Sequence, residues 1–143
     1  MQQAMQNVSS AREARLMQYL IASVFLTLGG WCVIAPASII HLGVRPQYQT
    51  DALIALVAIG AFGAQAILAG LFAAFSIFTR RTFLVYGVAL LPFFVFDWWF
   101  YARVPLVNEL MLIDVAGNVA MLAMCARGYR ALRPTPTTPR PAP

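Results

Sequence analysis

Four long apolar segments dominate this sequence and limit the folds that are open to it. They cover residues 16–40, 52–78, 82–101 and 106–126. A helix needs about 20 apolar residues to cross the hydrocarbon core of a bilayer, and each segment reaches that length. None of them alternates apolar and polar residues with a period of two, which disfavours a membrane β-barrel. The sequence therefore predicts four membrane-spanning helices.

The composition agrees with this interpretation. Hydrophobic residues make up 61% of the 143 residues, and charged residues only 10%. A soluble domain is about half apolar and about a quarter charged, so the excess apolar surface here is expected to face lipid. The links between the segments are short, which makes successive helices antiparallel neighbours. We predict an all-α fold, an integral membrane four-helix up-down bundle covering residues 16–126.

The arginines predict the orientation of this bundle. Eight of the ten lie in the N-terminal arm (1–15), in the link between the second and third segments, and in the C-terminal region 127–143. The opposite side has only Arg45 and Arg103. Because arginine-rich flanks stay in the cytoplasm, we predict a multi-pass protein with both termini cytoplasmic. A cleaved signal peptide is disfavoured, since the first apolar segment is longer than is usual for one. Region 127–143 is basic and rich in proline and threonine, so we expect a disordered tail.

Recognisable cofactor and metal motifs are missing from the sequence. It has no P-loop, dinucleotide fingerprint, nucleophile elbow or zinc motif. The two cysteines, Cys32 and Cys125, lie inside apolar segments at different expected depths and lack the spacing of a zinc site. The arginines occur in short clusters between apolar segments, which is a poor pattern for nucleic-acid binding. We expect a lipid bilayer as the surroundings and no cofactor, metal or nucleic acid.

Small residues form a stripe on the second segment. Gly63, Ala66, Gly70 and Ala74 recur at spacings of three and four, which keeps them on one face of a helix. Such a stripe lets two backbones approach closely and drives helix association in lipid. The partner can be another helix of this chain, a second copy or another protein, and the sequence leaves these alternatives open.

Polar residues inside the last two segments are the candidates for function, because ionisable groups in membrane helices usually face a cavity or the bundle interior. Asp114 is expected near a depth of about 12 Å, at about 1.5 Å per residue. Asn118 lies one turn deeper on the same face, and Gln65 of the second segment is expected at a similar depth. We predict that these three form one hydrogen-bonded set.

A second group of polar and aromatic residues is expected near the outer surface. Asp97 and Glu109 flank the last link, which carries Arg103, and an ion pair with this arginine is the structural alternative to a functional role. Trp98, Trp99 and Tyr101 end the third segment. They are typical of an interfacial aromatic belt, but they can also form the wall of a substrate site. The catalytic candidates are Asp114, Asp97 and Glu109. The substrate-binding candidates are Gln65, Asn118, Trp98, Trp99 and Tyr101.

Several short motifs occur in an order that is similar to a known family. The first segment closes on Ala35-Pro36, the next link begins His41-Leu42-Gly43, and Gln65 is followed by Ala69-Gly70-Leu71. In this order they resemble the DoxX-like small four-helix membrane proteins, from the first segment to about Trp99. The resemblance implies a four-helix fold and a mixed, poorly defined activity. That family often has a glutamate where this chain has Gln65, so the charge that a redox or proton role would use is absent there.

Three functions are considered, and the sequence favours the first, with the second as the main alternative and the third ranked last. The first is a non-enzymatic accessory or scaffold subunit, which fits the small size, the short links and the small-residue stripe. The second is a membrane-embedded enzyme, an isomerase, cyclase or oxidoreductase, that uses the acidic residues on a lipophilic substrate such as a terpenoid, polyketide or quinone. Carboxylic acids in apolar pockets act as general acids and bases. The third is transport of a small solute by an oligomer.

Overall fold

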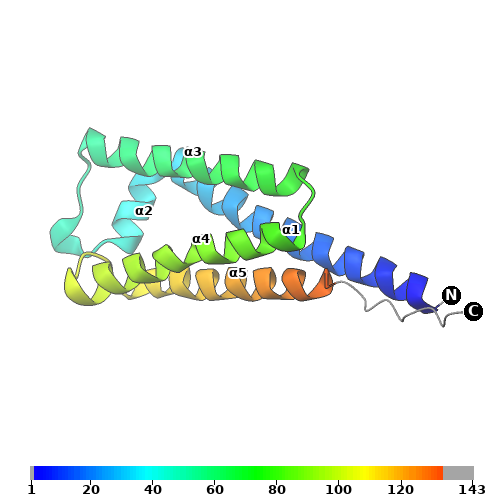
Figure 1. Ribbon diagram of the computed structural model, residues 1–143. Helices are drawn as coiled ribbons and strands as arrows, with labels where there is room; N and C mark the ends of the chain where they lie inside the picture. The colour runs from blue at the N-terminus through cyan, green and yellow to red at the C-terminus, as the bar shows by residue number, and fades with distance from the viewer. Residues whose placement is uncertain (1, 134–143) are drawn as a thin grey trace, which may run out of the picture.

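The computed structural model describes residues 2–133, with side chains from residue 8 onward (Figure 1). Its regular elements are all helical, apart from an isolated bridge between Val44 and Val107. Four helices are long and apolar enough to cross a membrane. The elements are α1 (Gln2–Ile34), α2 (Pro36–Gly43), η1 (Pro46–Tyr48), α3 (Leu53–Phe75), α4 (Arg80–Trp98), η2 (Trp99–Arg103, a π-helical turn), η3 (Glu109–Met111) and α5 (Leu112–Ala131).

The first apolar segment is divided into two helices, where the sequence predicted one. α1 ends at Ile34, and Ala35 has φ −139° and ψ 59°, outside the helical region. Pro36 then occupies the first turn of α2. The cause is local, because proline lacks an amide hydrogen and its ring disfavours the helical conformation at the residue before it.

The ends of the chain also differ from the prediction. α1 begins at Gln2, so the predicted N-terminal arm (1–15) is helical from residue 2 and continuous with the first long helix. The last long helix, α5, begins at Leu112 and continues to Ala131. Region 127–143 is therefore helical at its start, and residues 134–143 of the predicted tail lie outside the described part. Asp114 lies in the first turn of α5, which is closer to the helix end than its predicted position.

α1 is the central element of the arrangement. It contacts α3 on one side and α5 on the other, and α4 packs along α5 (Figure 1). The buried core lies where α1, α4 and α5 meet, around the fully buried side chains of Ile21 and Phe83. The Phe83 ring covers Gly128 so closely that a Cβ atom there would overlap it. Glycine at this position therefore lets the ring lie flat against α5.

The small-residue stripe of α3 is used inside the chain, where it packs against α1. A Cβ atom on Gly29 would lie 2.7 Å from the carbonyl oxygen of Gly63, and a Cβ atom on Gly63 would lie 2.7 Å from that of Gly29. A Cβ atom on Gly70 would lie 2.8 Å from Cγ of Leu26, and Ala66 is buried. The two backbones therefore touch, which is the close approach that small residues permit.

A buried glutamine, which sequence analysis did not single out, fastens the end of α3 to α1. The Gln18 side chain is 6% exposed. Its Nε2 donates to the carbonyl oxygens of Ala73 at 2.7 Å and Ser76 at 2.8 Å. The last carbonyls of a helix lack partners within the helix, so this amide satisfies two groups that would otherwise be unpaired. The only signal in the sequence is a polar residue near the start of an apolar segment.

Candidate functional site

Two carboxyl groups from different helices share one amide. Nδ2 of Asn118 donates to Oδ2 of Asp97 and to Oδ2 of Asp114, both at 3.2 Å. Asn118 is only 4% exposed, and both aspartates are half-buried. We call these three residues the carboxyl pair and its asparagine. Sharing one amide brings two acidic groups together, an arrangement that couples their protonation in enzymes that place carboxyl groups side by side.

Helix geometry explains how this group is assembled. Asp114 and Asn118 are one turn apart on α5, so their side chains lie on the same face. Asp97 reaches them from the last turn of α4, which packs along α5. Asp114 also lies in the first turn of α5, where the helix dipole favours a negative charge. The positions of all three side chains are thus fixed by regular helices.

The largest cavity beside this group has a volume of about 350 Å³ and lies between α1, α2 and α3 on one side and α4 and α5 on the other. Asp114 and Asn118 contribute polar atoms to its wall. Most of the other lining side chains are apolar, including Leu28, Trp31, Phe62, Phe93, Ile113 and Met121. A mainly apolar cavity with a few convergent polar groups is typical of a site for a small ligand.

A second, smaller cavity adjoins the carboxyl pair at Asp97. It has a volume of about 80 Å³, and its wall includes Asp97 and Tyr101. Such a volume has room for water, which occupies about 30 Å³ per molecule in the liquid. The carboxyl pair therefore adjoins the large apolar cavity at Asp114 and the small one at Asp97.

Two of the candidate polar residues, Gln65 and Glu109, lie outside this group. Gln65 was expected beside Asn118, but it is exposed on α3. Because its helix turns the stripe of Gly63 and Ala66 toward α1, the Gln65 side chain is directed outward. Glu109 is also exposed, in η3, and it makes no ion pair among the described residues. The predicted trio is thus replaced by one in which Asp97 takes the place of Gln65.

The aromatic wall differs from the prediction as well. Trp98 and Trp99 are 55% and 46% exposed, and the described lining of the large cavity does not include them. The guanidinium of Arg103 lies over the ring of Trp98, 5.9 Å from its centre, instead of pairing with a carboxylate. Tyr101 contributes to the small cavity. The aromatic residues that line the large cavity are Trp31, Phe62 and Phe93. Their places along the sequence do not reveal that these side chains face the cavity.

Known proteins give no further guidance. No family model, curated protein or solved structure matches this chain. The geometry of the site is therefore the basis for its function.

Among residues 2–133, no three His, Cys, Asp or Glu side chains are grouped to hold a metal ion. Cys32 and Cys125 are buried free thiols.

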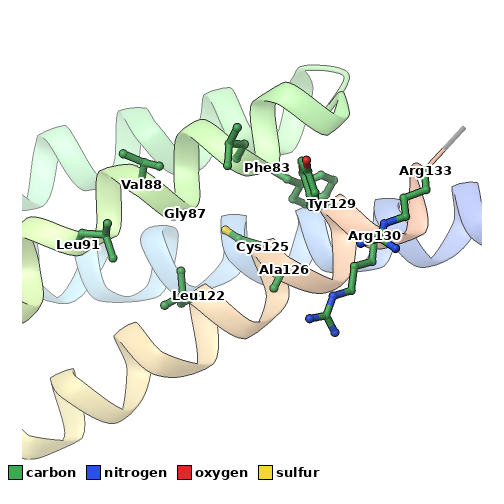
Figure 2. Close-up of a pocket in the computed structure, with 11 residues that line it drawn as sticks. Phe83, Gly87, Val88, Leu91, Leu122, Cys125, Ala126, Tyr129, Arg130 and Arg133 are labelled. Carbon is green, nitrogen blue, oxygen red and sulfur yellow. The ribbon is translucent and has the colours of Figure 1, made fainter.

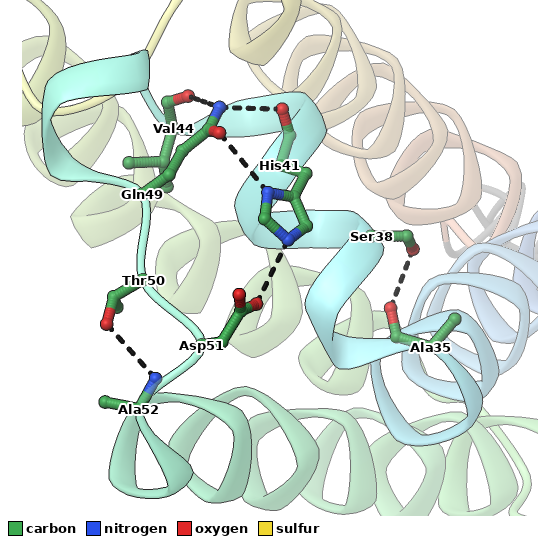
Figure 3. A network of polar contacts seen from close by, with 8 residues as sticks. All are labelled: Ala35, Ser38, His41, Val44, Gln49, Thr50, Asp51 and Ala52. Carbon is green, nitrogen blue, oxygen red and sulfur yellow. Dashed lines mark hydrogen bonds and ion pairs between the residues drawn. The ribbon is translucent and has the colours of Figure 1, made fainter.

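A polar network closes the loop between α2 and α3 (Figure 3). The Gln49 amide donates to the carbonyl oxygens of His41 and Val44, at 3.0 and 2.9 Å, which directs its Oε1 toward Nδ1 of His41 at 3.2 Å. Nε2 of the same imidazole lies 3.1 Å from Oδ1 of Asp51. Two acceptors face the two ring nitrogens, and only the protonated imidazole can donate to both.

This network is expected to raise the pKa of His41 above its ordinary value of 6.5, first through the hydrogen bond to Gln49 and then through Asp51. A raised pKa means that the network stabilises the folded chain fully below that ordinary value. The contribution is then lost as the pH rises through the higher folded value. His41 is the only histidine, so an NMR titration of histidine-labelled protein reports it directly. We expect a midpoint above 6.5 and a lower one in Gln49→Leu. A midpoint at or below 6.5 in the unmodified chain would contradict the network.

Proposed function

We propose that the four long helices cross a membrane as an up-down bundle with both termini in the cytoplasm. Their length and apolar composition support insertion. Exposed large hydrophobic side chains occur on all four, for example Ile34, Ile54, Val85 and Ile113, and a chain of this kind would expose too much apolar surface to water. The arginine distribution supports the orientation.

Within this bundle, we propose that the protein is a membrane-embedded acid–base enzyme that acts on a lipophilic substrate. One observation carries this proposal, namely that Asn118 holds Asp97 and Asp114 together beside a large apolar cavity. A substrate of the terpenoid, polyketide or quinone class suits the apolar lining. Its oxygen-bearing or unsaturated end would lie against Asp114.

Asp97 and Asp114 would have different roles, because they line different cavities. Asp114 lines the large cavity and would exchange a proton with the substrate. Asn118 would hold the carboxyl pair together by donating to both partners. Asp97 lines the small cavity, so it would return the proton to water or receive one from it. Proton donation to a substrate and proton removal from it, both at Asp114 with Asp97 exchanging protons with water, is the chemistry of an isomerase. The faces of Trp31, Phe62 and Phe93 can stabilise positive charge that develops on the substrate.

Isotope exchange tests this proposal even while the substrate is unidentified. The protein would be incubated in nanodiscs with a lipid extract of its native membranes in D₂O, and deuterium incorporation into each extracted compound would be measured. We expect one lipophilic compound to gain deuterium, and Asp114→Asn to slow this by about 10²–10⁴-fold. Asp51→Asn, which changes an exposed loop carboxylate, is the matched control. Exchange that persists in both Asp114→Asn and Asp97→Asn would eliminate the proposal.

Gln65 supports a second candidate, an accessory or scaffold role. In this bundle its exposed amide would face lipid from the middle of α3, and it makes no hydrogen bond with the described residues. Glutamine in a membrane helix gains a partner when it associates with another helix. The small-residue stripe is already occupied by α1, so association would use this outer face instead.

Crosslinking separates this role from the enzyme. We expect Gln65→Cys to crosslink in native membranes to a second copy or to a partner subunit, whereas Val85→Cys, on the exposed face of α4, serves as the control. Equal crosslinking at the two positions, or none at either, would argue against a partner at α3.

A further inference from the structure

A groove between α4 and α5, far from the carboxyl pair, is a candidate for lipid binding (Figure 2). It has a volume of about 410 Å³ and is formed by residues from Phe83 to Leu91 on α4, from Leu122 to Arg130 on α5, and by Arg133 just after α5. Its apolar lining includes Leu84, Val88 and Leu91, and small residues such as Gly87 and Ala126 make room for it. None of these residues belongs to the cavity beside Asp114.

One end of this groove is positively charged. Arg130 and Arg133 contribute to its lining and lie beyond Tyr129 in Figure 2. Arg80 adds a third guanidinium, stacked on the Tyr129 ring at 4.1 Å from its centre. Among the described residues these three arginines form no ion pair, in contrast to Arg127, which pairs with Glu13 at 3.0 Å. Within the described part of the chain, no carboxylate therefore neutralises the positive end of the groove.

The length of the groove matches one leaflet of a bilayer. From Leu122 to the end of α5 at Ala131, this side of the groove extends about 14 Å, at about 1.5 Å per residue. Half of a hydrocarbon core of about 30 Å is about 15 Å. A phosphate at the arginines would thus leave one acyl chain lying along the groove down to the middle of the membrane.

We propose that this groove binds an anionic glycerophospholipid, with its phosphate against Arg130 and Arg133 and one acyl chain between α4 and α5. The occupant follows from charge complementarity and from the apolar groove that continues from the charged end. Basic pockets between membrane helices bind anionic headgroups in this way. The proposal depends on membrane insertion but not on the enzyme, because no residue is shared with the carboxyl pair.

Lipid titration followed by native mass spectrometry tests this site on the full chain in detergent. The probes are phosphatidylglycerol and phosphatidylcholine with identical acyl chains, and inorganic phosphate as a headgroup without a chain. We expect tighter binding of phosphatidylglycerol. In Arg130→Gln/Arg133→Gln its affinity should fall about 30-fold, from about 1 kcal/mol per arginine, and phosphatidylcholine, whose choline neutralises its own phosphate, should lose much less. Arg81→Gln, an exposed arginine at the same end that does not line the groove, should have little effect.

A second pair of variants tests the acyl chain. Ala126 is exposed within the groove, so Ala126→Leu should fold and should weaken binding of both phospholipids, whereas Ala123→Leu, exposed on another face of α5, should not. The proposal is overturned if the double arginine variant keeps its preference for phosphatidylglycerol, if inorganic phosphate binds as tightly, or if Ala126→Leu has no effect. Efficient Val88→Cys crosslinking between two copies, independent of the lipid added, would assign the groove to a second copy and also overturn it.

Discussion

Replacing Gly29 with alanine is expected to destabilise the fold by about 3 kcal/mol, the upper part of the range of about 1–3 kcal/mol for overpacked cores. The added methyl group would meet the carbonyl oxygen of Gly63 at 2.7 Å and the amide nitrogen of Ile67 at 2.8 Å. Both atoms belong to the backbone of α3, so no side-chain rotation relieves the overlap. α1 and α3 would have to separate.

The neighbouring glycine provides a matched control. A Cβ atom on Gly30 meets nothing within 4 Å. Because alanine favours a helix over glycine by about 1 kcal/mol, Gly30→Ala should leave the stability unchanged or raise it. SDS titration of each variant in mixed micelles, read as the free energy of unfolding, measures the difference. Equal effects of the two substitutions would show that α1 and α3 do not meet at Gly29.

Gly29→Ala should also change the shape of the large cavity, because α1 and α3 both line it. Leu28, Trp31 and Cys32 of α1 line the large cavity, as does Phe62 of α3. Separation of α1 from α3 would therefore widen this cavity at a distance from the carboxyl pair. A loss of substrate binding in Gly29→Ala, with Asp97 and Asp114 unchanged, would be a packing effect and not a chemical one.

Replacing Gln18 with leucine is expected to cost about 1–3 kcal/mol, because the carbonyl oxygens of Ala73 and Ser76 would lose their donor in a buried place. Leucine is similar in size and apolar, so packing is largely kept and the loss reports the hydrogen bonds. The end of α3 should open first. Hydrogen exchange at the last amides of α3 should accelerate more than exchange in its middle.

Ser23→Ala is the control for this prediction. The Ser23 hydroxyl donates to the Leu20 carbonyl within α1 at 2.8 Å and is exposed, so its removal should change stability by no more than about 0.5 kcal/mol. If Gln18→Leu were as mild as Ser23→Ala, the bonds to α3 would contribute nothing to the fold.

Much of the candidate site could be predicted from spacing along a helix. Asp114 and Asn118 are four residues apart, and this alone places them together on one helix face. Asp97 was predicted as a separate residue near the surface, and its bond to Asn118 depends on how α4 and α5 are aligned. Trp98 and Trp99 were candidates by residue type, but the rotation of the α4 end directs them away from the cavity.

The burial of the two helical glutamines, Gln18 and Gln65, could not be predicted from the sequence. Gln18 and Gln65 are both single polar residues in long apolar helices, yet Gln18 is buried against α3 and Gln65 is exposed. In a soluble helix the apolar stripe would reveal which side faces the core. These helices are apolar on nearly every side, so that signal is missing.

The sequence by itself determined the number of long helices and the all-helical class. Each of the four apolar segments has the length of about 20 residues that a membrane helix needs, and a helix satisfies its backbone N–H and C=O groups within the segment. The break before Pro36 has a local cause in the sequence, proline's missing amide hydrogen, but one continuous helix was predicted there. The tertiary structure alone decided which face of each helix turns inward. Lipid and protein interior are similarly apolar, so close packing, and not hydrophobicity, decides the inward faces: Gly29 meets Gly63 between α1 and α3, and Phe83 covers Gly128 between α4 and α5, the two helices that bring Asp97, Asp114 and Asn118 together.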